Sequence, residues 1–261
     1  MKSIAIILSG QLRTYRECFN SFNENILKIL KNNYYVDIYC HIWNYEKKED
    51  IEELLYLYKP NKYIITESIN YKLPDFCEEL YFQECENFPY SKIDTHTNQK
   101  YGIYKAFDLV KNNEKIYDFV MRCRYDCLFE KNICLNEIEN MKKNCIYVGY
   151  GHTKYLNNCQ TNMNDAFAFG FYEDMEKYSN FYENINLILK DIKDRNVPEQ
   201  YTYLFNCINF ALLFKFYINH YCKLKNNISK IEFCLLRDSG KKIYFSNCIY
   251  NYYGVKYIKK T

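Results

Sequence analysis

The chain has 261 residues, of which 48% are hydrophobic and 26% charged, and its formal net charge is +3. These values are typical of a globular protein with a sizeable core, and they exclude an intrinsically disordered chain. Basic and acidic residues are interleaved, and only the segment 254–260 is locally basic, so the charge pattern does not indicate a nucleic-acid-binding surface.

The cysteines and the apolar segments bear on the compartment. Thirteen cysteines are present and none forms a C-x-x-C pair, so reduced, buried thiols are predicted instead of a disulfide scaffold or a zinc site. The apolar run from Ile4 to Leu8 is too short for a signal peptide, and no segment approaches the ~20 apolar residues of a membrane span. The sequence predicts a cytoplasmic protein without a membrane span.

In chain order, the first third alternates strand and helix patterns. Residues 3–10 (SIAIILSG) resemble a central parallel strand that enters a loop, and Thr14 and Glu17 predict a capping box for the helix that follows. Two further strands, 36–43 and 62–66, flank a helix that ends at Pro60. This βαβαβ opening predicts an α/β fold, an α/β/α sandwich with a mainly parallel, Rossmann-like central sheet.

The rest of the chain continues the alternation after an irregular excursion over residues 68–98. No linker or internal repeat is present, so a single domain, 1–261, is predicted, with a ligand-binding half at 1–130 and a second half at 131–261. The further predicted elements are a helix at 97–114, strands at 117–129, 145–151 and 165–170, and helices at 173–194 and 198–219.

Two motifs follow the first two strands. Residues 9–13 (SGQLR) precede a helix, where Ser9, Gly10 and Gln11 offer backbone amides to an anion and Arg13 can bind phosphate, although a plain turn explains the pattern equally well. His41 and Trp43 share one face at the carboxyl end of the second strand, where ligands bind in open α/β sheets. Their alternative is a buried histidine beside a core tryptophan.

Charged residues also lie at the carboxyl-terminal end of the strand predicted at 117–129. Arg122, Arg124 and Asp126 are spaced by two, so they are predicted to share a face, and buried guanidiniums need a partner or an anionic ligand. The alternative is a structural ion pair with Asp126, Asp118 or Asp165. Asp165 itself stands at the start of the strand 165–170, as a general base, a group that orients a hydroxyl, or a turn residue.

Taken together, four segments resemble a group of GT-A-fold glycosyltransferases of bacteria and giant viruses, with the motifs SGQ-x-R, H-x-W, R-x-R-x-D and an acidic segment similar to NDAFAFG. The resemblance covers residues 4–170 in order, with a fainter match near 198–209. It implies a nucleotide-diphosphate-sugar donor and a glycan or glycoprotein acceptor, and, for a viral source, the host cytoplasm or the virion.

The resemblance also assigns roles to the site residues. Ser9, Gly10, Gln11 and Arg13 would contact the nucleotide or diphosphate, His41 and Trp43 would line the donor pocket, and Asp165 would be the catalytic base. The family carries a D-x-D motif that binds Mn²⁺ or Mg²⁺, but here Arg124 replaces the first acid. Either Asp126 binds the metal alone, or Arg122 and Arg124 neutralise the pyrophosphate.

Three other functions remain open from the sequence. They are a binding protein that holds a nucleotide sugar without turnover, an RNA-binding module, and a nucleotidyltransferase or sugar-phosphate enzyme on a related sheet. The oligomeric state is not predicted.

Overall fold

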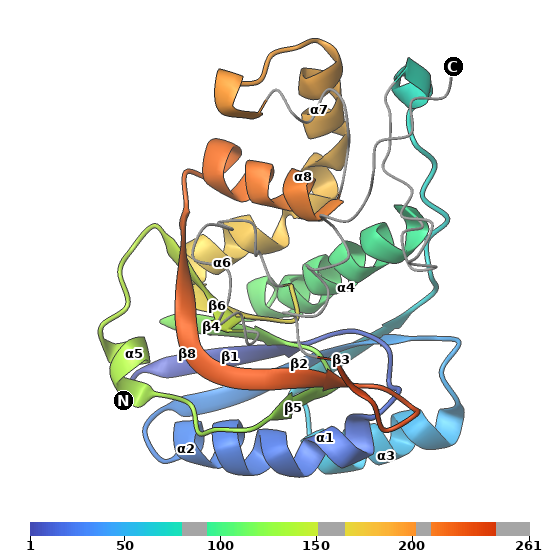
Figure 1. Cartoon of the computed structure of the whole chain (residues 1–261). Helices are drawn as coiled ribbons and strands as arrows, with labels where there is room; N and C mark the ends of the chain where they lie inside the picture. Colours follow the sequence, from blue (N-terminus) through green and yellow to red (C-terminus); the bar gives the residue numbers. More distant parts are fainter. Residues whose placement is uncertain (80–92, 151–164, 202–209, 244–261) are drawn as a thin grey trace.

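The computed structural model describes residues 1–79, 93–150, 165–201 and 210–243. It confirms the predicted α/β class, because one twisted sheet lies between two groups of helices (Figure 1). The strands are β1 (Ser3–Leu8), β2 (Tyr35–Trp43), β3 (Lys62–Thr66), β4 (Phe119–Cys123), β5 (Cys127–Phe129), β6 (Cys145–Tyr150), β7 (Phe167–Phe171), β8 (Lys225–Leu236) and β9 (Lys242–Ile243).

The described strands form a nine-stranded sheet in the order β3-β2-β1-β4-β7-β6-β8-β5, with β9 paired to β8. The four strands from β3 to β4 are parallel, and β7 is antiparallel to both of its neighbours, β4 and β6. Since β8 is parallel to β6, strands β3, β2, β1, β4, β6 and β8 run in one direction. The mainly parallel sheet expected from the βαβαβ pattern is therefore confirmed.

Each face of the sheet carries its own hydrophobic core. Alternate residues of β1 belong to different cores: Ile4 and Ile6 lie on one face, and Ala5 and Ile7 on the other. Helices α1, α2 and α3 cover the first face, and α4, α6, α7 and α8 lie over the second (Figure 1). The helices are α1 (Tyr15–Phe22), α2 (Lys28–Lys31), α3 (Lys48–Tyr58), α4 (Ile93–Lys111), α5 (Leu135–Glu139), α6 (Tyr172–Ser179), α7 (Phe181–Lys193) and α8 (Phe210–Phe216).

Several local predictions need correction. The segment 117–129 is not one strand. Strand β4 ends at Cys123, and β5, which begins at Cys127, is the last strand in the strand order, beside β8. Arg122, Arg124 and Asp126 therefore do not share one strand face. The helix predicted at 173–194 is interrupted at Asn180, between α6 and α7.

The predicted capping box at Thr14 is also wrong. The Thr14 side chain makes no capping hydrogen bond to α1, and its Oγ1 donates instead to the carbonyl of Leu236, at 3.0 Å. A tertiary contact with the end of β8 thus replaces the local cap.

The other element predictions agree with the described residues. Helix α3 ends before Pro60 as expected, with Lys59 in the left-handed conformation at φ 46°. Within the excursion a short 3-10 turn is formed at Asp75–Glu79, and residues 80–92 lie outside the described part. Of the helix predicted at 198–219, residues 202–209 lie outside the described part as well. The described remainder is only partly α-helical, since residues 199–201 form a 3-10 turn and α8 spans Phe210–Phe216. None of the helices in the described ranges has both the length and the apolar character that a bilayer span requires.

Candidate active site at the carboxyl edge of the sheet

The predicted motifs meet at one edge of the sheet. Strands β1, β2 and β4 are parallel, so their carboxyl ends share an edge, and the Ser9 amide donates to the carbonyl of Cys123 at 3.3 Å. Strand β7 is antiparallel to β4, so its amino end, with Asp165 just before it, lies at the same edge. The amide of Arg124 donates to the carbonyl of Ala166 at 3.0 Å, which joins these two segments.

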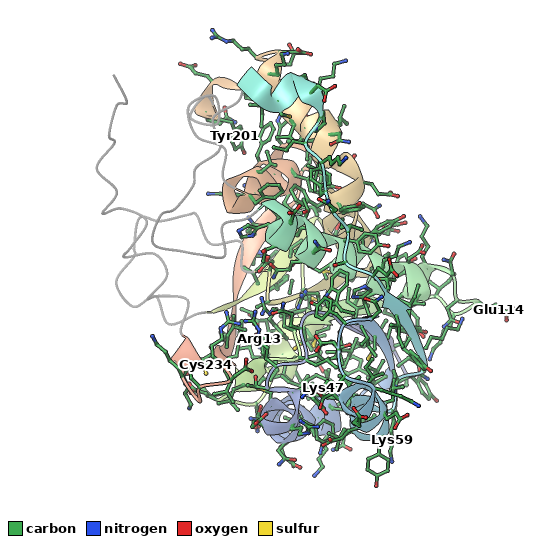
Figure 2. All side chains as sticks on the ribbon, turned by 90° about the vertical axis from the view of Figure 1, so that its right-hand side faces the viewer. Arg13, Lys47, Lys59, Glu114, Tyr201 and Cys234 are labelled. Carbon is green, nitrogen blue, oxygen red and sulfur yellow. The ribbon has the colours of Figure 1, made fainter. Side chains whose placement is uncertain are left out.

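The carboxyl end of β8 reaches this edge too. The amide of Leu236 donates to the carbonyl of Asp126 at 2.9 Å, and the carbonyl of Leu236 accepts a hydrogen bond from the Thr14 hydroxyl. Arg237 and Asp238, which follow, are thus carried next to Asp126 and the start of α1. In Figure 2, Arg13 and Lys47, which follow β1 and β2, lie on the opposite side of the sheet from Glu114, which precedes β4.

Arg122 is fully buried and joins two of the edge loops. Its Nη1 donates to the carbonyl of Ala166 at 2.8 Å, and its Nη2 donates to the carbonyl and hydroxyl oxygens of Ser9 at 3.4 and 3.3 Å. Its Nε has no acceptor among the described residues. Contact with a ligand would require this buried side chain to move, so in this arrangement Arg122 fixes the Ser9 loop to the start of β7.

Arg124 and Asp126 form a bidentate ion pair. Arg124 Nε and Nη2 each donate to one carboxylate oxygen of Asp126, and both bonds are 2.7 Å long. Arg237 Nη1 donates to the second of those oxygens at 3.1 Å. The Asp126 side chain is 1% exposed, whereas those of Arg124 and Arg237 are 15% and 26% exposed. The side chains of Arg124 and Arg237 thus keep some exposed surface, whereas the carboxylate of Asp126 is buried between them.

A second ion pair stands beside the first. Lys100 of α4 donates to Asp165 Oδ2 at 2.8 Å, and its ammonium lies 3.7 Å from the centre of the Phe214 ring. Burial alone would raise the pKa of Asp165, but the charges of Lys100, Arg122 and Arg124 outweigh it and lower the pKa. Asp165 is therefore an ionised carboxylate and, in this state, a weak base.

An open cavity of about 380 Å³ lies beside the start of α1, and Asp238, which follows Arg237 in the chain, is one of its lining residues. Gln11 and Arg13 of the predicted anion loop line it, together with Tyr45, Glu46 and Asp238. Glu46 accepts the amide of Leu12 at 3.1 Å, and burial raises the pKa of its carboxyl group. Tyr15, Arg16 and Asp50 also line the cavity, which thus combines arginines, carboxylates and tyrosines, a lining that suits a polar ligand with hydroxyl groups.

Gly10 and the Arg124 side chain pack together at the margin of this cavity. Gly10 has φ +134°, a conformation that side-chain-bearing residues rarely adopt, and a Cβ there would lie 3.7 Å from Arg124 Cγ. A glycine is therefore favoured here because of the backbone conformation of the loop, and not because a larger residue would clash with its neighbours.

His41 and Trp43 lie in the interior under α4. His41 Nε2 is 2.8 Å from Thr66 Oγ1, and its ring meets Trp43 edge-on at 4.4 Å. A Cβ on Gly102 of α4 would come within 3.0 Å of His41 Nδ1, so helix and strand approach closely there. Both side chains are buried, as in the alternative of a core histidine and tryptophan. Tyr45, which is stacked on Trp43, lines the cavity together with Tyr15.

The residues at this edge do not fit a divalent cation. Mg²⁺ and Mn²⁺ are usually held by one or two carboxylates together with waters and phosphate oxygens, but both oxygens of Asp126 already accept hydrogen bonds from guanidiniums. No group of three or more His, Cys, Asp and Glu in the described part of the chain is arranged to hold a metal. No step of the chemistry is therefore derived through Mn²⁺ or Mg²⁺.

Two of the charged groups have no sequence signal. Lys100 stands within an amphipathic helix, and Arg237 follows a strand more than a hundred residues after Asp126. Only the pairing of β8 with β5, and the packing of α4 on the sheet, bring them to the site.

The chain matches no family model and no curated protein sequence. Among solved structures, it is similar to the glycosyltransferase GlyE of Streptococcus pneumoniae TIGR4, with a TM-score of 0.41, 11% identity, and coverage of 88% of this chain and 46% of GlyE. Mouse xyloside xylosyltransferase 1 in its apo form gives a TM-score of 0.40 and 11% identity, over 87% of this chain and 84% of that one. The chain spans less than half of the length of GlyE. At this level of similarity, neither structure bears on the activity of this chain.

Proposed function

We propose that this chain is a glycosyltransferase that moves a sugar from a nucleotide-diphosphate donor to a glycan or protein-linked acceptor. The observation that carries the proposal is the charge at the carboxyl edge of the sheet. Lys100, Arg122, Arg124 and Arg237 contribute four positive charges, and Asp126 and Asp165 contribute two negative ones, which leaves an excess of two among these residues. A diphosphate is an anion that would offset such an excess.

The lining of the neighbouring cavity suits the nucleoside part of such a donor. Gln11 and Arg13 come from the motif that resembles the family's nucleotide-binding loop, and Glu46 offers a carboxylate to ribose hydroxyls. Arg237 and Asp238 are adjacent in the chain, so the cationic groups and the cavity are neighbours. In this proposal the nucleoside occupies the cavity and the diphosphate faces Arg124 and Arg237.

Catalysis would come from positioning and from stabilisation of the leaving diphosphate. Guanidiniums held by Asp126 need no reorganisation when negative charge develops on the leaving group. Asp165 is 23% exposed and would face the acceptor side, as the base or as a group that orients the sugar. Its lowered pKa favours the second role.

The low basicity of Asp165 also favours a second candidate, a protein that binds a nucleotide sugar without turnover. Incubation of the chain with a panel of nucleotide sugars and glycan acceptors separates the two, because transfer releases a nucleoside diphosphate. Binding without any release supports the second candidate, and release of pyrophosphate indicates a nucleotidyltransferase. Affinity for RNA that falls steeply with salt and is unchanged in Arg124→Ala would contradict both glycosyl-donor functions.

A further inference from the structure

We infer that the diphosphate-binding centre works without a divalent cation, with Arg124 and Arg237 as its phosphate ligands and Asp126 as the residue that positions them. The inference rests on the proposed function and names residues and chemistry for the same site. It reverses the role of Asp126, which the sequence motif alone suggests as a metal ligand.

The first argument is the geometry of Asp126. Its two carboxylate oxygens accept three hydrogen bonds of 2.7, 2.7 and 3.1 Å from two guanidiniums. A divalent cation could bind these oxygens only if both arginines withdrew from Asp126, and withdrawal would place a new positive charge beside two partly buried guanidiniums. The arrangement is therefore stable as a guanidinium centre and unfavourable as a metal centre.

The second argument is which groups face outwards. Asp126 is 1% exposed, but Arg124 and Arg237 keep 15% and 26% of their side-chain surface. In the described part of the chain, the hydrogen bonds of the Arg124 guanidinium come from Nε and Nη2, and both go to Asp126. Nη1 remains available to donate to a phosphate oxygen, in a charge-assisted hydrogen bond.

The third argument is the surrounding charge. Lys100 and Arg122 lie close enough to lower the pKa of Asp165, so they share one electrostatic environment with Arg124. Lys100 is itself buried, and burial lowers its pKa against the opposing effect of Asp165. A divalent metal ion here would add to the existing excess of positive charge, whereas a diphosphate would offset that excess.

The test uses inorganic pyrophosphate as the probe, titrated into the full chain by calorimetry in EDTA and again in Mg²⁺. We expect binding in EDTA, and a loss of about 10- to 100-fold in affinity for Arg237→Gln, since the variant loses a charge-assisted hydrogen bond to the phosphate. Arg237→Lys should retain an intermediate affinity. Lys131→Gln is the matched control, because Lys131 pairs with Glu232 on the surface, and it should bind like the wild type.

Asp126→Asn tests the positioning role directly. The amide keeps one acceptor for a guanidinium, so we expect pyrophosphate affinity to fall and the remaining binding to stay insensitive to EDTA. If this variant does not fold in a thermal melt, Arg237→Lys and Arg237→Gln still decide the question. The inference is overturned if pyrophosphate binds the wild type only with Mg²⁺, or if Mn²⁺ alone binds the wild type and not Asp126→Asn.

Two results distinguish failure of this inference from failure of the proposed glycosyltransferase function. Glycosyl transfer that stops in EDTA would overturn the metal-free centre and leave the transferase assignment intact. Metal-independent pyrophosphate binding that depends on Arg237, with no transfer from any nucleotide sugar, would uphold the centre and contradict the transferase.

Discussion

Lys100 and Asp165 form an ion pair of 2.8 Å across 65 positions of sequence, between the middle of α4 and the start of β7. The lysine is buried and the aspartate partly exposed, so the pair is open to solvent only on its acidic side. The pair holds the Asp165 carboxylate at the carboxyl edge of the sheet, and it joins α4 to the sheet at the same point.

Removal of the ammonium should destabilise the protein. Lys100→Met keeps the apolar contact with Phe214 but leaves Asp165 without its partner, so we expect a loss at the lower end of the about 3–5 kcal/mol typical of a broken buried pair. Lys111→Met is the control, because its pair with Glu176 is exposed and should contribute less than about 1 kcal/mol. Urea denaturation of both variants measures the difference, and equal losses would contradict the importance of the buried pair.

The same pair gives a dependence of stability on pH. The folded-state pKa of Asp165 is lowered, so its stabilising contribution is present above the unfolded value of about 3.9 and is lost as the pH falls below it. The difference in unfolding free energy between wild type and Lys100→Met should therefore shrink below about pH 4. A difference that stays constant from pH 7 to pH 2 would show that Asp165 is not ionised in the fold.

Asp165→Asn tests the acceptor side of the proposed reaction. We expect turnover to fall by orders of magnitude while donor affinity changes little, because donor binding is assigned to Arg124 and Arg237. Glu114→Gln, on the opposite edge of the sheet, is the control. Equal losses of turnover and donor affinity would make Asp165 a donor-binding residue instead.

Gly10→Ala tests the backbone of the loop beside Arg124. The φ of +134° should cost about 1–3 kcal/mol with a side chain present, although the space around it would admit a methyl group. The variant should lose stability and should also bind pyrophosphate more weakly than the wild type. Unchanged binding in Gly10→Ala would separate the loop from the site.

His41 should remain neutral through the physiological range. Burial, with a smaller contribution from Lys105, lowers its pKa to about 3. Because the unfolded imidazole takes up a proton near pH 6.5, stability from this residue is complete above that value and declines as the pH falls toward 3. An NMR titration, with the signal assigned by its loss in His41→Asn, should show no midpoint above pH 5. A midpoint near 6.5 would place the ring in contact with solvent.

Much of the fold could be predicted from local pattern. The apolar run of β1 and the helices that alternate with β2 and β3 predicted a parallel sheet, since a central strand that is buried on both faces is apolar over its whole length. Pro60 correctly marked the end of α3. The Thr14 capping box failed because the end of β8, more than two hundred residues away, offers the hydroxyl a carbonyl partner.

Local pattern was enough to place several residues at the carboxyl edge, because the SGQLR loop, the segment Arg122 to Asp126 and Asp165 follow or precede strands whose direction the pattern predicts. The contacts that those residues make there depend on the packing of distant segments. The break after Cys123 turns Arg124 onto Asp126, and the long-range pairing of β8 and packing of α4 add Arg237 and Lys100. A charge takes its role from the partners within a few ångströms, and here those partners are set by contacts between distant segments.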